Sequence, residues 1–142
     1  METKIIDILM KEANKAYKAD EIPVGAVITR KDKIIATGHN NKQKKHDVTG
    51  HAEIIAIKKA AKKLKDWRLE DCTLYVTLEP CNMCKEVIRQ SRISKVCYLL
   101  DSSFNSEINK EIEYSLSTPD PSISETYNEL LKKYFRSKRN KH

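Results

Sequence analysis

The chain has 142 residues, of which 39% are apolar and 33% are charged. A chain of this length buries roughly two-thirds of its unfolded surface, so we expect a single domain over residues 1–142 with one core. No apolar run approaches the ~18 to 20 residues that a membrane span needs, which argues against a membrane protein. The first residues, Met1–Lys4, lack the pattern of a secretory signal, and we expect a cytoplasmic protein.

The positive charge is unevenly distributed. Lys and Arg number 27 against 20 Asp and Glu, a formal net charge of +7. Asp101–Leu130 holds seven acidic residues and one lysine, whereas Leu131–His142 holds six basic residues and no acidic one. This segregation favours a polyanionic partner, although lysine-rich helices with solvated surfaces would give a similar composition.

The first half of the chain predicts a helix, a hairpin and a second helix. Apolar residues recur at helical spacing from Thr3 to about Ala19. Two β-branched runs, Val24–Thr29 and Lys33–Thr37, are joined by three polar residues and predict a hairpin. The polar stretch Gly38–Gly50 predicts a loop, and helical spacing resumes from about His51 to Lys65.

The second half alternates strands with helices. Cys72–Leu78 is a β-rich run, and Pro80 suits the first turn of a short helix that continues to about Gln90. Lys95–Leu100 predicts a strand. A half-exposed edge strand is expected where apolar and polar residues alternate, with the apolar positions at Ile112, Tyr114 and Leu116.

The last predicted element is a basic helix from about 122 to 139. Pro119 and Pro121 break the chain before it, and Ser122 with Glu125 forms a possible capping box. Its apolar face would consist of Ile123, Tyr127, Leu130, Leu131, Tyr134 and Phe135. Helices that alternate with strands in this order indicate an α/β fold with a sheet covered on both faces.

The candidate chemistry lies in two short motifs, His51-Ala52-Glu53 and, some thirty residues later, Pro80-Cys81-Asn82-Met83-Cys84. Each motif alone is weak, because a histidine at a helix start is often a cap and a C-x-x-C pair is often redox-active or structural. Together they fit the H-x-E…P-C-x-x-C pattern of zinc deaminases. One imidazole and two thiolates suit Zn²⁺ and leave a fourth position for water, which is typical of a catalytic site.

We therefore predict one Zn²⁺ per subunit, held by His51, Cys81 and Cys84, with Glu53 as general base and acid. A structural zinc would need a fourth protein ligand. The remaining candidates have no spacing that recommends them; they are His39, His46, Cys72 and Cys97. The two cysteines among them are expected to be small, buried and inert.

Longer blocks of the sequence resemble the bacterial tRNA-specific adenosine deaminases, over most of residues 1–100. The matching blocks are Glu21–Val27, Gly38–Asn40, His46–Glu53, Thr73–Cys84 and Ser91–Ile93. The resemblance implies a three-layer α/β/α cytidine deaminase-like fold with a central five-stranded mixed sheet, and a homodimer. It also implies conversion of the wobble adenosine (position 34) of a tRNA anticodon arm to inosine, with zinc-activated water attacking C6 of adenine and Glu53 moving protons.

The resemblance also assigns substrate contacts. Asn40 would hydrogen-bond the nucleoside, the Ala52 backbone amide would contact the base, and the pocket would include Ile22, Val24 and Pro80. Two basic segments are expected to contact RNA, one with Lys44, Lys45 and His46 and the other with Arg136, Lys138 and Arg139. The segment Leu99–Asn109 departs from the family, which usually has a Gly-Ala-basic-Asp stretch there.

Two alternative functions use the same residues differently. The first is a deaminase of a free base, nucleoside or nucleotide, of the guanine or cytosine type, because the same zinc chemistry serves those reactions. The second is an RNA-binding protein with a non-catalytic zinc. Glu53 discriminates against the second alternative, because a structural zinc site has no need of that carboxylate.

Overall fold

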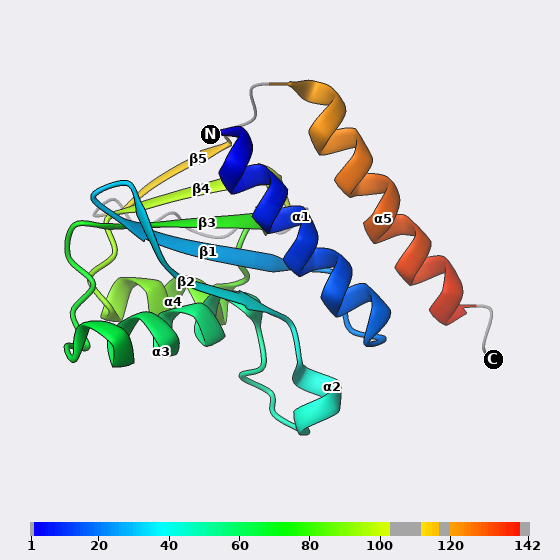
Figure 1. The fold of residues 1–142 in the computed structure, drawn as a ribbon. Coiled ribbons are helices and arrows are strands. Elements are labelled where there is room, and N and C mark those ends of the chain that lie inside the picture. Colours follow the sequence, from blue (N-terminus) through cyan, green and yellow to red (C-terminus); the bar gives the residue numbers. More distant parts are fainter. Residues whose placement is uncertain (1, 103–111, 117–119, 140–142) are drawn as a thin grey trace.

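A computed structural model describes residues 2–102, 112–116 and 120–139 of the chain (Figure 1). The first five elements are α1 (Thr3–Lys18), β1 (Gly25–Arg30), β2 (Lys33–His39), α2 (Lys42–Lys45) and α3 (Ala52–Leu64). They are followed by β3 (Cys72–Leu78), α4 (Asn82–Gln90), β4 (Lys95–Leu100), β5 (Glu113–Leu116) and α5 (Pro121–Arg139). Within these ranges no helix is long and apolar enough to cross a membrane.

The five strands form one mixed sheet in the order β2-β1-β3-β4-β5. β1 pairs antiparallel with both β2 and β3, whereas β3, β4 and β5 run parallel to one another. The parallel connection from β3 to β4 passes through α4, as such connections require. The sheet confirms the predicted five-stranded mixed α/β architecture, with β5 at an edge.

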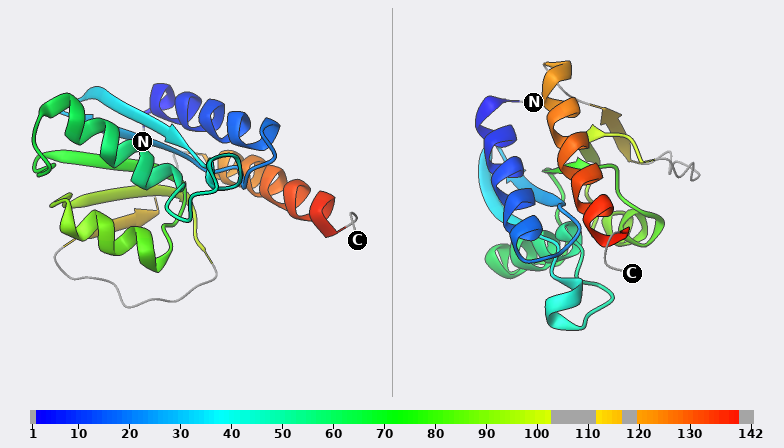
Figure 2. Two further views of the ribbon diagram at one scale, coloured as in Figure 1. Left: turned by 90° about the horizontal axis from the view of Figure 1, so that it is seen from below. Right: turned by 90° about the vertical axis from the view of Figure 1, so that its right-hand side faces the viewer.

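Helices cover both faces of the sheet. α1 and α5 lie side by side on one face, and α3 and α4 cover the other (Figures 1 and 2). Each face has its own core, because successive side chains of a strand point to opposite sides. In β1, Val27 packs with α1 residues such as Leu9, whereas Ala26 and Ile28 belong to the larger core with α3 and α4. The predicted three-layer arrangement is therefore confirmed.

The predicted loop Gly38–Gly50 is partly wrong. β2 continues to His39, and Lys42–Lys45 form the short helix α2. The reason is a contact that local sequence does not reveal: the buried carboxylate of Glu21 accepts the backbone N–H groups of Gln43 and Lys44, at 2.9 and 2.8 Å. This contact satisfies two of the donors that a helix start leaves unpaired.

The predicted capping box of the last helix is also wrong. α5 begins at Pro121, and the backbone N–H of Ser122 donates to the Asp120 side chain at 2.9 Å, so Asp120 supplies the cap. Proline at the first helical position loses no hydrogen bond there. Of the predicted apolar face, Tyr127 and Tyr134 are buried, whereas Phe135 is 43% exposed.

Candidate active site

His51 stands directly before α3, with extended backbone angles (φ −95°, ψ 143°) at the N-cap position. Its placement depends on the close approach of α3 to β2 at Gly38. A Cβ atom on Gly38 would lie 2.7 Å from the Ala52 carbonyl oxygen, closer than real Cβ atoms come. Beyond β2, the Asn40 side chain accepts the Ala52 N–H at 2.7 Å and ties the two segments together.

Cys81 holds the equivalent position before α4, also with extended backbone, and Cys84 is the third residue of that helix. The side chains of residues three apart at a helix start point to the same side. The candidate ligands therefore stand at the starts of α3 and α4.

Three side chains converge there. His51 Nδ1 lies 3.7 Å from Cys81 Sγ and 3.5 Å from Cys84 Sγ, and all three atoms lie within 4.8 Å of one another. Zinc at ~2.3 Å from sulfur and ~2.0–2.1 Å from nitrogen in a tetrahedron separates these two kinds of ligand by roughly 3.6 Å. The donor set therefore fits zinc in both chemistry and spacing. In the described part of the chain, no fourth His, Cys, Asp or Glu joins this cluster.

The cluster also favours deprotonation of one thiol. Hydrogen bonds from the Cys84 thiol and from His51 lower the pKa of Cys81 to about 3. The same Cys81–Cys84 hydrogen bond, together with burial, raises the pKa of Cys84, so the pair shares one proton. The hydrogen bond with Cys81 raises the pKa of His51. A cation held by these side chains would replace that shared proton, because thiolates are the form that binds metals.

Glu53 is the second residue of α3 and is only 3% exposed. Burial raises the pKa of its carboxyl group to about 7. A carboxyl group with such a pKa exchanges protons readily in both directions at neutral pH. Glu53 is close to the cluster without belonging to it, as expected for a proton carrier that is not a ligand.

A cleft of about 150 Å³ opens beside the cluster. Its lining residues are Ile22, Val24, Asn40, His51, Glu53, Leu78, Glu79, Cys81 and Ser102. Apolar side chains from two segments therefore face polar groups that converge near Glu53. An arrangement of apolar walls and few polar groups is typical of a small-molecule site.

The sequence reasoning did not identify the pocket residues Leu78, Glu79 and Ser102. Leu78 is the last residue of β3, and Glu79 and Ser102 follow β3 and β4. The carboxyl ends of these parallel strands meet at one edge of the sheet, where ligands commonly bind in α/β proteins. The residues that follow two parallel strands could therefore have been predicted to line a site. The Glu79 carboxylate accepts the Ser102 N–H at 3.2 Å and forms an ion pair of 3.0 Å with Lys85.

Of the five residues expected to contact substrate, three line the cleft and two do not. Ile22, Val24 and Asn40 line the cleft. The Ala52 N–H is donated to Asn40, and Pro80 is buried outside the lining. The roles of all five in substrate binding remain predictions.

The expected RNA-binding residues lie on two elements. Lys44 and Lys45 are exposed on α2, and His46 follows with a left-handed backbone (φ 52°). Arg136 and Arg139 are exposed on α5, whereas the Lys138 ammonium pairs with Asp20 at 2.6 Å. Part of the divergent segment, residues 103–109, lies outside the described residues.

Comparison with known families agrees with this geometry. Residues 1–100 match the family described as the cytidine and deoxycytidylate deaminase zinc-binding region. The chain belongs to this zinc-binding deaminase family. The match includes all three cluster residues and Glu53.

Individual relatives of this deaminase differ in the substrate that their names give. The tRNA-specific adenosine deaminase of Aquifex aeolicus is 34% identical over 95% of this chain and 94% of that protein. A structure from work on A-to-I editing by tRNA:A34 deaminases at the wobble position is 39% identical, with a TM-score of 0.69, over 70% of this chain and 77% of that one. The guanine deaminase of Bacillus subtilis is 29% identical, with a TM-score of 0.66, over 100% of this chain and 96% of that one.

Proposed function

We propose that this protein is a zinc-dependent hydrolase that converts the wobble adenosine (position 34) of a tRNA anticodon to inosine. The observation that carries the proposal is the convergence of His51, Cys81 and Cys84 beside the buried Glu53. The Aquifex relative, which matches over nearly the whole chain, favours a tRNA substrate.

His51, through Nδ1, and the thiolates of Cys81 and Cys84 would hold one zinc ion. When bound, zinc supplies a water molecule that is acidic enough to attack at neutral pH. With three protein ligands, the site keeps room for that water.

Glu53 would carry the protons of the reaction. It accepts one proton from the attacking water and delivers it to N1 of adenine as the C6–O bond forms. It then moves the second proton of that water to the departing amino group as the C6–N bond breaks. Water and adenosine are consumed and inosine and ammonia are produced, and Glu53 ends in its starting state.

The cleft would hold the extruded adenine. Ile22 and Val24 exclude water from one side, and Asn40 presents its amide group to the nucleoside. Ala52 adjoins the cleft through its hydrogen bond with the Asn40 side chain, and Pro80 stands between Glu79 and Cys81, which both line the cleft. An extruded base is needed because a stacked base cannot reach the reacting group.

The anticodon arm would contact the basic residues beside the cleft and on α5. Lys44, Lys45 and His46 form one contact, and the other comprises Arg136, Arg139 and, after release from Asp20, Lys138. Such contacts bind phosphates irrespective of sequence. A homodimer and a cytoplasmic location remain predictions from the resemblance and the sequence.

A second candidate is the deamination of free guanine. The likeness to the Bacillus subtilis guanine deaminase along the entire chain favours it. The small, largely apolar cleft would accept either purine. The segregated basic charge of α5 favours the RNA substrate over the free base.

The test is to incubate the purified zinc-loaded protein with an anticodon stem-loop that carries adenosine at the wobble position. Digestion to nucleosides and chromatography would detect inosine. The same protein is incubated with free guanine, and xanthine is measured. Inosine formation supports the first candidate, xanthine formation alone supports the second, and neither product from a fully loaded protein contradicts both.

A further inference from the structure

The five residues Asp20–Val24, which join α1 to β1, form a junction between the cleft and two basic elements. Its last two residues contact different parts of the molecule. The Pro23 carbonyl accepts a hydrogen bond of 2.7 Å from Tyr127 of α5. The Val24 carbonyl accepts the Asn40 N–H at 3.2 Å, and Val24 itself lines the cleft. Movement of this segment would therefore displace a wall of the cleft.

Glu21, the second residue of the junction, extends the connection to α2. Its side chain is 2% exposed, and its two carboxylate oxygens accept the backbone N–H groups of Gln43 and Lys44 at 2.9 and 2.8 Å. Its own neighbour Ile22 lines the cleft. One buried carboxylate thus joins the cleft wall directly to the start of α2.

α2 has few other means of holding its position. It has four residues, none of them buried, and Asn41 at its N-cap makes no side-chain cap hydrogen bond. A helix this short is not stable by itself in water. The hydrogen bond from Asn41 N–H to the Gly50 carbonyl fixes the base of the loop, while Glu21 fixes the helix start.

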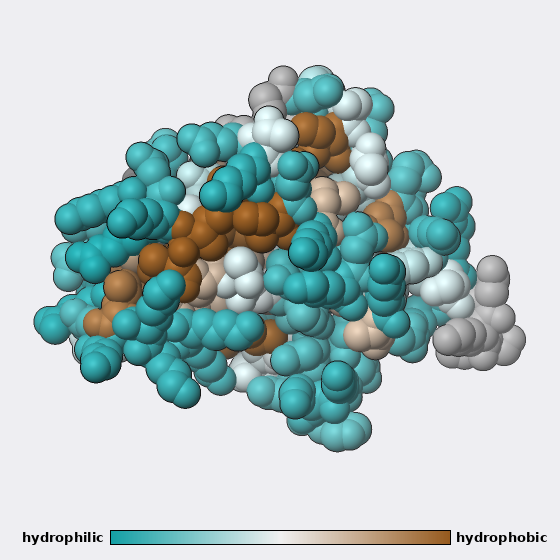
Figure 3. Space-filling view, viewed as in Figure 1, coloured by the Kyte–Doolittle hydropathy of each residue, from teal (hydrophilic) through white to brown (hydrophobic). Residues whose placement is uncertain are grey.

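The exposed side of this region is basic and hydrophilic. Lys42, Lys44, Lys45 and His46 are all exposed, and the α2 region at the bottom of Figure 3 shows hydrophilic side chains. Lysines on flexible segments bind phosphates less effectively than lysines held in place, because ordering the segment costs free energy on binding. A fixed α2 would therefore present its charges at a set distance from the cleft.

We propose that Glu21 is a positioning residue for RNA binding: it holds the basic segment Lys42–His46 in register with the cleft wall. This role rests on the proposed RNA substrate. Glu21 neither lines the cleft nor belongs to the cluster of His51, Cys81 and Cys84, and it acts through the backbone of Gln43 and Lys44. Its effect is on substrate affinity and leaves the chemical step unchanged.

The first test is Glu21→Gln, which keeps the size of the side chain but replaces one acceptor oxygen with an N–H donor group. Amide hydrogen exchange followed by NMR should show faster exchange at Gln43 and Lys44. With the stem-loop, KM should rise by about 5- to 10-fold with kcat within twofold, and the salt dependence of binding should weaken by roughly one phosphate contact. Zinc content should be unchanged.

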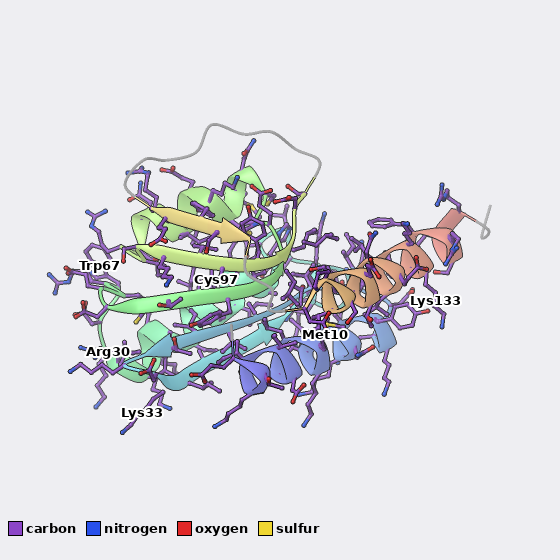
Figure 4. All side chains as sticks on the ribbon, turned by 90° about the horizontal axis from the view of Figure 1, so that it is seen from above. Met10, Arg30, Lys33, Trp67, Cys97 and Lys133 are labelled. Atoms are coloured by element: carbon purple, nitrogen blue, oxygen red, sulfur yellow. The ribbon has the colours of Figure 1, made fainter. Side chains whose placement is uncertain are left out.

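A matched control separates this effect from the loss of any carboxylate that accepts a backbone N–H. Asp66 accepts the Arg68 N–H at 3.1 Å and follows α3. It adjoins Trp67, which lies at the opposite end of the sheet from Lys133 of α5 (Figure 4). Asp66→Asn should leave KM, kcat and the salt dependence unchanged.

The decisive comparison is non-additivity. In a protein that already carries Lys44→Met and Lys45→Met, adding Glu21→Gln should raise KM by less than twofold, because the charges that Glu21 positions are gone. An equal rise of KM in both backgrounds overturns the proposal. So does an unchanged KM in the single variant, or a fall of kcat at constant KM.

Three further results bear on the proposal. Should Glu21→Gln fail to unfold cooperatively, Glu21→Asp is measured instead; it keeps the charge but is one methylene too short to reach both N–H groups, and the same predictions apply. A wild-type protein that neither binds nor deaminates the stem-loop contradicts the proposed function. Unaltered exchange at Gln43 and Lys44 contradicts the positioning role, whether or not RNA is the substrate.

Discussion

At the scale of single residues, Glu53 combines two properties that rarely occur together in a carboxyl group. It is almost fully buried, and burial raises its pKa to about 7. It also opens onto the cleft rather than into the apolar core. A perturbed carboxyl group in a cleft, beside a candidate metal-binding cluster, is a candidate catalytic group.

The first prediction concerns this carboxyl group. Glu53→Gln should reduce inosine formation by a factor of about 10² to 10⁴, because an amide of the same size cannot accept and return a proton. Zinc measured by atomic emission should stay at one ion per chain. Retention of near wild-type turnover would remove Glu53 from the proton-carrying role.

The second prediction separates the cluster cysteines from the others. Cys81→Ala removes a thiolate that faces His51, so the purified variant should hold far less zinc and should lose activity. Cys72→Ala is the matched control, because Cys72 is a buried free cysteine in β3. Equal zinc contents in the two variants would contradict the assigned ligand set.

At the scale of helices and strands, the site depends on how α1 and α3 pack against the first hairpin. Gly38 allows the Ala52 carbonyl of α3 to approach β2, which brings His51 beside Asn40. On the other face, Glu12 of α1 is 7% exposed and its Oε2 lies 2.7 Å from Nδ1 of His39 in β2. β2 is therefore held from both sides, directly before the residues that enter the site.

The third prediction concerns this Glu12–His39 contact. Burial by itself acts to raise the pKa of Glu12, but the hydrogen bond with His39 and the charge of Lys15 outweigh it, and the net pKa is lowered from 4.5. A lowered pKa in the folded state means that the carboxylate stabilises the fold above pH ~4.5, and that this stabilisation is lost as the pH falls through the folded-state pKa. Glu12→Gln should therefore cost about 1.5–3 kcal/mol at pH 7.

The measurement is urea unfolding of both proteins over a series of pH values. The difference in unfolding free energy should be largest near neutral pH and should shrink below pH ~4.5. Glu70→Gln, at an exposed position, should show no such pattern. A difference that stays constant with pH would show that the contact does not depend on the charge of Glu12.

At the scale of the whole molecule, basic groups from elements distant in sequence collect at one end. The last turns of α1 and α5 both carry basic residues, and α2 lies at the same end (Figures 1 and 2). Lys138 of α5 is tied to Asp20 after α1, which joins two of these elements directly. The cleft wall continues from the same junction through Ile22.

The fourth prediction tests the contribution of α5 to RNA affinity. Replacing Arg136 and Arg139 together with methionine keeps the helix and the buried Tyr134 while removing two exposed charges. Binding of the stem-loop, measured by fluorescence anisotropy at several salt concentrations, should weaken, with a salt slope lower by roughly 1 to 2. Glu125→Gln, on the first half of α5, is the control. An unchanged salt slope would show that the charges of α5 do not contribute to RNA binding.

The sequence by itself determined the α/β class and nearly all helix and strand positions. It also identified the three residues that converge in the structure and the buried Glu53 beside them, whose roles remain predictions. These features depend on periodicity and on short spacings, which are local properties of the sequence. His51 and Glu53, and likewise Cys81 and Cys84, lie within one helical turn of each other. The sequence did not determine α2 or the role of Asp120 as the cap of α5, because the groups that stabilise those helix starts were not the ones that local patterns favour.

The tertiary structure decided which residues meet. Glu79 and Ser102 join the cleft because β3 and β4 run parallel and end at the same edge, and Glu21 reaches α2 across 22 positions of sequence. Lys138, predicted to contact RNA, is paired with Asp20 in this structure. Contacts of this kind depend on strand order and side-chain direction, and neither is encoded in the spacing of any single segment.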